Sequence, residues 1–313
     1  MLKGMELSQG FYELCKEQLF AGGLGAFRGY LAMGLVGEGS ECYGYDDELS
    51  QDHDFGPDFC IWIPEKIYQE NRNQFIAAYD ALPMEYRGYR RDASEQTRAR
   101  RGIMTIEGFY QKYTGILHDP ANAEEWFRIP QGFLAVATNG AVFEDSYGEF
   151  TRRRNYLLAY YPEDVIRKKL AAKAVVMGQA GQYNYVRCCR REEWESAYLA
   201  GSEFVGAALS AVYLLNKKYM PFYKWAFRGT DSLSELRHAI VDLKEFVHLQ
   251  DTSENAVRKR VLIEDICNEV ACALRKKGYS TSASDFLASH GNSIMEGIRD
   301  VGLRSMHVLV DYN

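Results

Sequence analysis

The sequence lacks several features that would assign it to a common class of protein. Its seven cysteines form no Cys-x-x-Cys pair, so neither a disulfide framework nor a zinc ribbon is indicated, and we expect a reducing compartment. Basic residues are not in excess: 37 Lys and Arg stand against 43 Asp and Glu, a formal net charge of −6. This balance disfavours a protein that covers a nucleic-acid duplex. We find no internal repeat and no low-complexity tract.

No apolar run is long enough to predict a membrane span. The longest apolar stretch, residues 19–36, is interrupted by Arg28 and by five glycines, whereas a spanning helix needs about 20 mostly apolar residues. The first residues carry charges and lack the apolar core of a secretory signal. We therefore expect a cytoplasmic protein with no membrane partner.

What is present is a globular composition with two kinds of periodicity. Apolar residues recur at helical spacing over Glu6–Phe20 and Glu65–Leu82. Strands are predicted over Gly29–Gly37, Asp54–Ile63, Gly102–Phe109 and Phe133–Phe143, the last as a hairpin that turns at Asn139–Gly140. After Pro162 only helices are predicted, over Glu163–Gly178, Arg191–Tyr219, Leu233–Leu249, Glu254–Lys277 and Ser284–Ile298. The sequence thus predicts an α+β fold: a mixed sheet with flanking helices over residues 1–160, then an all-helical domain over residues 161–313.

The segment from residue 37 to residue 59 carries the most chemical information. Gly39 and Ser40 follow an apolar strand, where a missing side chain lets backbone N–H groups and a hydroxyl approach phosphate oxygens. Asp52-His53-Asp54 then leads into the next predicted strand, in which alternation would place both carboxylates on one face. Paired carboxylates are costly to hold charged without a cation, and Mg²⁺ prefers one or two carboxylates plus substrate phosphates. Two such ions can clamp the oxygens of a phosphoryl displacement.

Three familiar motifs do not fit this segment. A calcium-binding EF-hand loop starting at Asp52 would need Gly and Glu where Pro57 and Ile63 stand. A dinucleotide-binding fingerprint fails at Cys42, and a phosphate-binding Walker A loop would need a Gly-Lys-Ser/Thr ending. The remaining alternative is a solvated acidic turn. The apolar run Phe59–Ile63 favours the metal site, because it places Asp52 and Asp54 at the beginning of a buried strand.

Gly-Ser after a strand, followed beyond residues 41–51 by Asp-x-Asp, resembles the nucleotidyltransferase (polymerase-β-like) superfamily. The longer string GEGSECYGYDDELSQDHDFGPDF resembles a bacterial branch of that superfamily without an assigned function. Later strings similar to this branch are AVFEDSYGEF at Ala141–Phe150, the turn Tyr161–Asp164, GQYNYVRCCRR at Gly181–Arg191 and NKKYMPFYKW at Asn216–Trp225.

The resemblance implies a role for each matching residue. Gly39 and Ser40 would hold the triphosphate of a nucleotide, while Asp52 and Asp54 would ligate two Mg²⁺ ions. The superfamily has a third carboxylate on a later strand, as metal ligand or general base. Glu107, after the predicted strand Gly102–Ile106, and Asp145, after Ala141–Phe143, are the two alternatives, with Glu107 ahead on chain order.

Lys224 lies within an aromatic cluster, where its ammonium group could reach the β- and γ-phosphates. An ordinary surface lysine on a packed helix is the alternative.

These features predict an Mg²⁺-dependent nucleotidyltransferase. It would move a nucleoside monophosphate from a nucleoside triphosphate, with ATP preferred, to a hydroxyl of an acceptor that the sequence does not identify. A small-molecule acceptor is preferred to protein or RNA. The alternative function is a nucleotide-binding regulatory module, or a toxin–antitoxin-like enzyme that modifies protein or tRNA.

Overall fold

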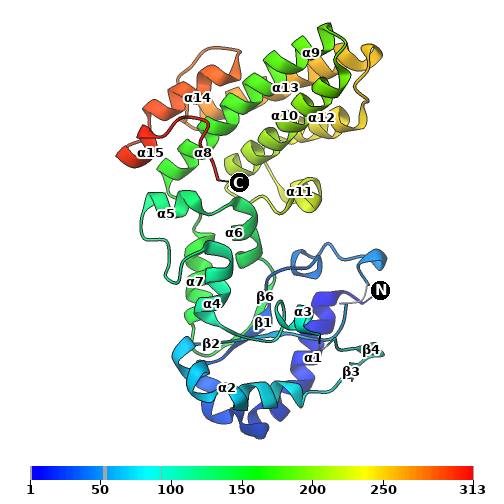
Figure 1. The fold of residues 1–313 in the computed structure, drawn as a ribbon, viewed down its shortest axis with the longest axis vertical. Coiled ribbons are helices and arrows are strands. Elements are labelled where there is room, and N and C mark those ends of the chain that lie inside the picture. Colours follow the sequence, from blue (N-terminus) through cyan, green and yellow to red (C-terminus); the bar gives the residue numbers. More distant parts are fainter. Residues whose placement is uncertain (1, 52–54, 93, 313) are drawn as a thin grey trace. The chain divides into compact units, whose positions relative to one another are not determined.

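The computed structural model describes residues 2–51, 55–92 and 94–312, and it divides into two compact units. The first comprises Met1–Asp119 with Phe133–Ala159, and the second comprises Pro120–Gly132 with Tyr160–Asn313. The predicted α+β class is confirmed, since the first unit holds a small mixed sheet and the second is helical (Figure 1). The predicted boundary at residue 160 lies within one residue of the point where the chain finally passes from the first unit to the second, between Ala159 and Tyr160. Residues 120–132, however, belong to the helical unit.

The first unit is built on a four-stranded sheet in the order β5-β2-β1-β6. β1 (Ala32–Leu35) pairs antiparallel with β2 (Cys60–Ile63) and β6 (Ala141–Asp145), while β5 (Ile103–Thr105) runs parallel to β2. The end of β1 therefore meets the beginnings of the other three strands at one edge, which we call the exit edge. The opposite edge holds the beginning of β1 and the ends of β2, β5 and β6. A separate ribbon pairs β3 (Glu85–Tyr86) with β4 (Tyr89–Arg90).

Helices cover both faces of the four-stranded sheet (Figure 1). On one face, α1 (Gly4–Leu19) and α2 (Glu65–Asp80) form an apolar core with the strands that includes Phe11, Ile61 and Phe75. On the other face, α4 (Ile106–Thr114) and α7 (Glu149–Leu158) enclose Trp62, whose ring stacks on Phe150 at 3.9 Å between centroids. Because side chains alternate along a strand, successive residues of β2 enter the two cores, and all of β2 is buried.

Shorter elements complete the first unit. A π-helical turn, η1 (Phe20–Leu24), and a 3₁₀-helix, η2 (Gly25–Tyr30), join α1 to β1. Two further 3₁₀-turns, η3 (Glu41–Tyr43) and η4 (Glu48–Ser50), follow β1, and α3 (Glu95–Arg98) precedes β5.

Two predicted strands are wrong in part. Residues 133–138 belong to α6 (Gln131–Thr138), and Asn139–Gly140 joins this helix to β6 rather than turning a hairpin. An apolar run without periodicity suits either a helix or a strand, and here the Thr138 hydroxyl donates to the carbonyl of Leu134 (2.6 Å), one helical turn earlier. The predicted strand 102–109 changes into α4 at Ile106, because the Thr105 side chain caps this helix by accepting from Gly108 N–H.

The helical unit contains the five long helices that the spacing predicts. They are α8 (Glu163–Val176), α10 (Trp194–Leu215), α12 (Arg237–His248), α13 (Ser253–Lys276) and α14 (Leu287–Glu296). α8 continues through a π-helical segment, η5 (Met177–Tyr185), into α9 (Val186–Arg190). The shorter elements are α5 (Ala123–Arg128), α11 (Tyr223–Gly229), η6 (Thr230–Ser232) and α15 (Val301–Ser305).

α10 is apolar along most of its length. Among the described helices it is the one that is long and apolar enough to cross a membrane, and most of its apolar stretch is buried inside the protein.

Three lysines of α8 bind the last described residues of the chain. Lys168 Nζ donates to the carbonyl of Val310 (2.5 Å), and Lys169 and Lys173 form ion pairs with Asp311 (3.1 and 2.8 Å). Burial lowers the pKa of Lys168 to about 8. Burial alone would raise the pKa of Asp311, but its two lysine partners hold that pKa below the usual range.

Segment 120–132 is attached to the helical unit through two buried aromatic residues of α5. The ring of Trp126 meets that of Tyr161 edge-on at 5.9 Å between centroids. Phe127 packs against Tyr312 at 5.4 Å, and the ammonium of Lys169 lies 5.1 Å from the Phe127 ring centroid.

Candidate functional site

The chain leaves β1 through a turn that contains two glycines with left-handed backbone. Gly37 has φ of 131° and Gly39 has φ of 121°, a region that favours glycine. The N–H of Gly37 donates to Asn139 Oδ1 (2.9 Å), and Asn139 Nδ2 donates to the carbonyl of Gly37 (2.8 Å). At Gly39 a Cβ atom would lie 2.6 Å from the carboxyl carbon of Glu41. Asn139 therefore fixes the turn at Gly37, and the Glu41 carboxyl group fills the space that a side chain at Gly39 would need.

Ser40 follows, half-buried, as the N-cap residue that immediately precedes η3. Its carbonyl accepts from the N–H groups of Tyr43 (3.1 Å) and Tyr45 (2.9 Å). In the part of the chain that the structure describes, its hydroxyl has no hydrogen-bond partner. Gly39 and Ser40 thus lie at the exit edge with a hydroxyl that a ligand could engage.

Asp52 and Asp54, the predicted metal ligands, lie outside the described residues. Of the residues beside them, Phe55 packs edge-on against Tyr89 with ring centroids 5.4 Å apart. β2 begins at Cys60, so the predicted strand 54–63 is wrong for residues 55–59, where Gly56 and Pro57 bend the chain. Alternation along β2 therefore does not predict that both carboxylates lie on one face, and metal binding by the two acids stays a prediction.

Three other carboxylates near the exit edge are buried, and each is paired with a cation of the chain itself. The pairs are Glu41 with Arg101, Asp46 with Lys3 and Asp58 with Arg91. Burial raises the pKa of Asp58, although the Arg91 guanidinium at 3.3 Å and the Tyr79 hydroxyl oppose that rise. Because their charge is already compensated, these acids are poorly suited to hold Mg²⁺. Among the described residues no group of three or more His, Cys, Asp and Glu could hold a metal ion.

Glu107 and Asp145 lie at the opposite edge, away from Ser40. Asp145 faces Ala32 at the beginning of β1, and its carboxylate accepts from Gly148 N–H (2.7 Å) and Thr151 N–H (2.8 Å) at the start of α7. Glu107 lies in the first turn of α4 and accepts from the N–H of Glu65 (3.0 Å), where α2 begins.

These contacts give both candidates a structural role, and a third carboxylate at the metal site stays a prediction. Both candidates stabilise helix N-termini, and the sheet register does not bring either of them to the residues predicted to hold the nucleotide.

Lys224 belongs to the helical unit, on α11. Its side chain is exposed, and its ammonium lies 5.3 Å from the ring centroid of Trp225. This is a cation–π contact at the surface, and binding of phosphate by Lys224 stays a prediction.

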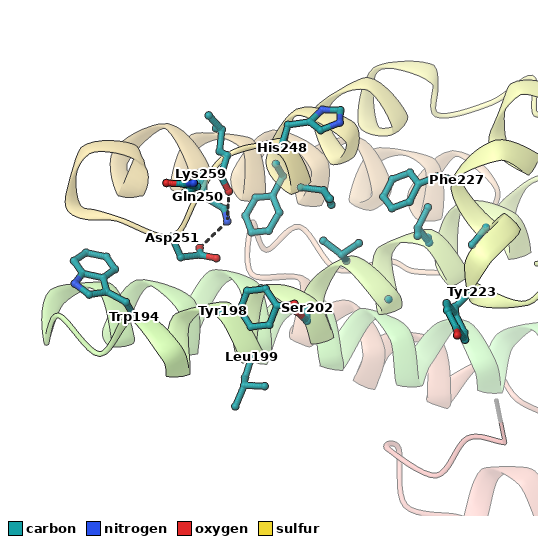
Figure 2. A pocket seen from close by; sticks show the side chains of 18 of the residues that line it. Trp194, Tyr198, Leu199, Ser202, Tyr223, Phe227, His248, Gln250, Asp251 and Lys259 are labelled. Atoms are coloured by element: carbon teal, nitrogen blue, oxygen red, sulfur yellow. Dashed lines mark hydrogen bonds and ion pairs between the residues drawn. The ribbon is translucent and has the colours of Figure 1, made fainter.

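The helical unit contains a cavity of about 1140 Å³ that follows α10 (Figure 2). Its walls are mainly apolar and aromatic, with contributions from Trp194, Tyr198, Leu199, Tyr223, Phe227 and Phe246. At one end, Lys259 Nζ donates to Asp251 Oδ1 (2.6 Å), which also accepts from the Tyr185 hydroxyl (2.7 Å). An apolar cavity with a few fixed polar groups is typical of a small-molecule site.

Arg154 and Asn139 are not identifiable as site residues from the sequence alone. The pair Asn139-Gly140 is typical of a hairpin turn, which conceals the contact of Asn139 with Gly37. One feature of the sequence that points to Arg154 is the run Arg152–Arg154. Consecutive residues of a helix point in different directions, so one of three adjacent arginines can lack the partners of the other two.

Comparison with known proteins adds a family match in the second half of the chain. Residues 126–226 match a family described as a domain of unknown function (DUF4037). No curated protein and no solved structure matches the chain. The matched segment contains Lys224 and the long helices α8 and α10, and it excludes Gly39, Ser40, Asp52 and Asp54. The chain is thus similar, over this segment, to a family whose function is not assigned.

Proposed function

We propose that the protein is an Mg²⁺-dependent nucleotidyltransferase that moves a nucleoside monophosphate from a nucleoside triphosphate, ATP in the first place, to a hydroxyl of a small molecule. The supporting observation is the turn at the exit edge. Gly37 and Gly39 leave backbone without side chains there, and the Ser40 hydroxyl has no partner among the described residues. Backbone of this kind can approach phosphate oxygens closely.

In the proposed reaction, the acceptor hydroxyl oxygen forms a bond to the α-phosphorus, the bond to the bridging oxygen breaks and pyrophosphate leaves. Gly39 and Ser40 would position the phosphates, and Asp52 and Asp54 would hold the metal ions. Bound Mg²⁺ would supply neutralisation of the charge on the transferred group. Because Glu107 and Asp145 lie at the opposite edge, the group that accepts the hydroxyl proton must be sought at the exit edge.

Two observations favour a small acceptor and a cytoplasmic location. The cavity of about 1140 Å³ in the helical unit has the apolar, aromatic walls of a small-molecule site. All seven cysteines are free, as is usual in a reducing compartment.

The direct test is incubation with each nucleoside triphosphate labelled at the α-phosphorus, with Mg²⁺ and a cell extract, followed by separation of small molecules, protein and RNA. We expect label in small molecules and a rise in melting temperature with ATP and Mg²⁺. Asp52→Asn with Asp54→Asn should abolish both effects. Glu48→Gln, which changes an exposed acid of the same loop, should leave both intact.

Unchanged melting temperatures with all nucleotides and with both Mg²⁺ and Mn²⁺ would contradict the proposal. Label in protein or RNA would instead favour the alternative of a toxin–antitoxin-like modifying enzyme.

A further inference from the structure

Arg154 is a half-buried arginine at the exit edge. It lies on α7, which packs along β6 and returns the chain from the opposite edge. Its Nη2 donates to the carbonyls of Asn139 (3.2 Å) and Gly140 (3.3 Å), while its Nε is buried without a partner. The Asn139 side chain binds both the N–H and the carbonyl of Gly37. One residue therefore separates the guanidinium from the turn that carries Gly39 and Ser40.

The two preceding arginines have acidic partners. Arg152 pairs with Glu149 and Asp119, each at 2.7 Å, and Arg153 pairs with Glu149 at 3.0 Å. Over residues 2–51, 55–92 and 94–312, no carboxylate pairs with Arg154.

Other cations near this edge are also compensated. Lys112 pairs with Glu38 at 2.8 Å, and Arg91 and Arg101 pair with the buried acids described above. Arg154 thus differs from its cationic neighbours in having no described counter-charge.

An arginine in this position is costly unless an anion approaches it. Burial lowers the pKa of Arg154, but a guanidinium remains charged at neutral pH and has five N–H donors. Two carbonyls satisfy Nη2 alone, and Nη1 has no acceptor among the described residues. A guanidinium binds phosphate through paired, charge-assisted hydrogen bonds.

We propose that Arg154 is an anion-binding residue that holds the phosphate chain of the ligand bound at the Gly37–Ser40 turn. The chemical class of that ligand is a polyphosphate, and its identity as a nucleotide rests on the proposed function. The contact with the main-chain carbonyl of Asn139 gives Arg154 a second effect, since a phosphate bound by Arg154 also helps to hold the residue whose side chain binds Gly37.

The test measures binding of inorganic tripolyphosphate and of ATP by isothermal titration calorimetry, with Mg²⁺ and with chelator. We expect Arg154→Gln to weaken both ligands at least about tenfold, the effect of losing a charge-assisted hydrogen bond. Arg154→Lys should recover part of the affinity, because it keeps the charge and loses the planar fork. The matched control is Arg152→Gln on the same helix. The affinity of this variant for both ligands should stay within about twofold of the wild-type value.

Circular dichroism and the midpoint of urea denaturation establish that each variant is folded. If Arg154→Gln does not fold, the comparison is made between wild type and Arg154→Lys. Equal tripolyphosphate affinity in wild type and Arg154 variants, or no binding by wild type, overturns the inference. If tripolyphosphate binds through Arg154 but no nucleotide is transferred, the anion site stands and the proposed function fails. If transfer occurs with an unchanged KM for the nucleotide in Arg154→Gln, the function stands and the inference fails.

Discussion

Gly37 and Asn139 hold each other through two hydrogen bonds, with the Gly37 N–H on Oδ1 at 2.9 Å and its carbonyl on Nδ2 at 2.8 Å. A single side-chain amide thus satisfies both polar groups of one residue. The pair joins the segment after β1 to the segment before β6, and it continues the pairing of those two strands past their last backbone partners, Leu35 and Ala141.

Asn139→Ala should destabilise the sheet unit and weaken phosphate binding. The substitution leaves the N–H and carbonyl of buried Gly37 without their partner, and we expect a loss of about 1–3 kcal/mol in unfolding free energy. Urea denaturation followed by circular dichroism measures it. Asn155→Ala, at an exposed position of α7, is the control and should change stability by less than about 0.5 kcal/mol. Similar stabilities of the two variants would show that the double contact is unimportant.

Gly39→Ala should be more costly than Gly44→Ala, although both glycines have positive φ. A Cβ at Gly39 would meet the Glu41 carboxyl group at 2.6 Å, whereas nothing lies within 4 Å of a Cβ at Gly44. We expect about 1 kcal/mol for Gly44→Ala from backbone strain alone, and about 3 kcal/mol for Gly39→Ala. Thermal denaturation at neutral pH compares them, and equal losses would contradict the close packing at Gly39.

Asp311→Asn should strongly destabilise the helical unit. The change removes the counter-charge of Lys169, which is fully buried, and of Lys173. Breaking one side of a buried ion pair costs about 3–5 kcal/mol. The control is Asp231→Asn, which breaks a surface ion pair with Lys244. The Asp231 side chain is 73% exposed, so this change should cost less than about 1 kcal/mol. A loss at Asp311 no larger than at Asp231 would sink this expectation.

The same carboxylate makes stability depend on pH in a defined direction. Because the pKa of Asp311 is lowered in the folded protein, its contribution is complete above the unfolded pKa of about 4. The contribution is lost as the pH falls through the lower, folded value. The stability difference between wild type and Asp311→Asn should therefore be constant at neutral pH and shrink below about pH 4. A difference that grew on acidification would contradict the assigned sign.

Gly206→Ala should stabilise α10, whereas Gly201→Ala should not. A Cβ at Gly206 meets nothing within 4 Å, and an alanine inside a helix is favoured over glycine by about 0.5–1 kcal/mol. At Gly201 a Cβ would lie 3.2 Å from the Phe246 ring, so the ring must move and the gain is lost. The melting temperatures of the two variants are measured under the same conditions, and that of Gly206→Ala should be the higher.

Much of the fold could be predicted from the sequence because apolar spacing is local information. Glu65–Leu82 has helical spacing and forms α2, and the helices after Pro162 follow the same rule. Residues 133–138 could not be assigned in this way, since an unbroken apolar run satisfies a helix and a strand equally. Nor could residues 120–132 be assigned to the helical unit, because Trp126 and Phe127 find their partners only after Tyr160.

The candidate site was predictable only where it follows one strand. Gly39 and Ser40 could be placed after β1 from the order of residues. The choice between Glu107 and Asp145 needed the register, which pairs Ala32 with Asp145 and puts both carboxylates at the opposite edge. Arg154 could not be distinguished from Arg152 in the sequence, since the difference lies in which of them has Glu149 and Asp119 within reach.

The attachment of α5 to the helical unit has a consequence for biosynthesis. A ribosome delivers Trp126 and Phe127 before the sheet unit is finished at Ala159, and long before Tyr312 emerges. Both aromatic rings of the nascent chain therefore stay unburied while the rest of the sheet unit can already fold. Translation can complete the sheet unit first, but the helical unit is assembled around a segment made earlier, so a chain that stops at residue 159 would expose both rings to chaperones and proteases.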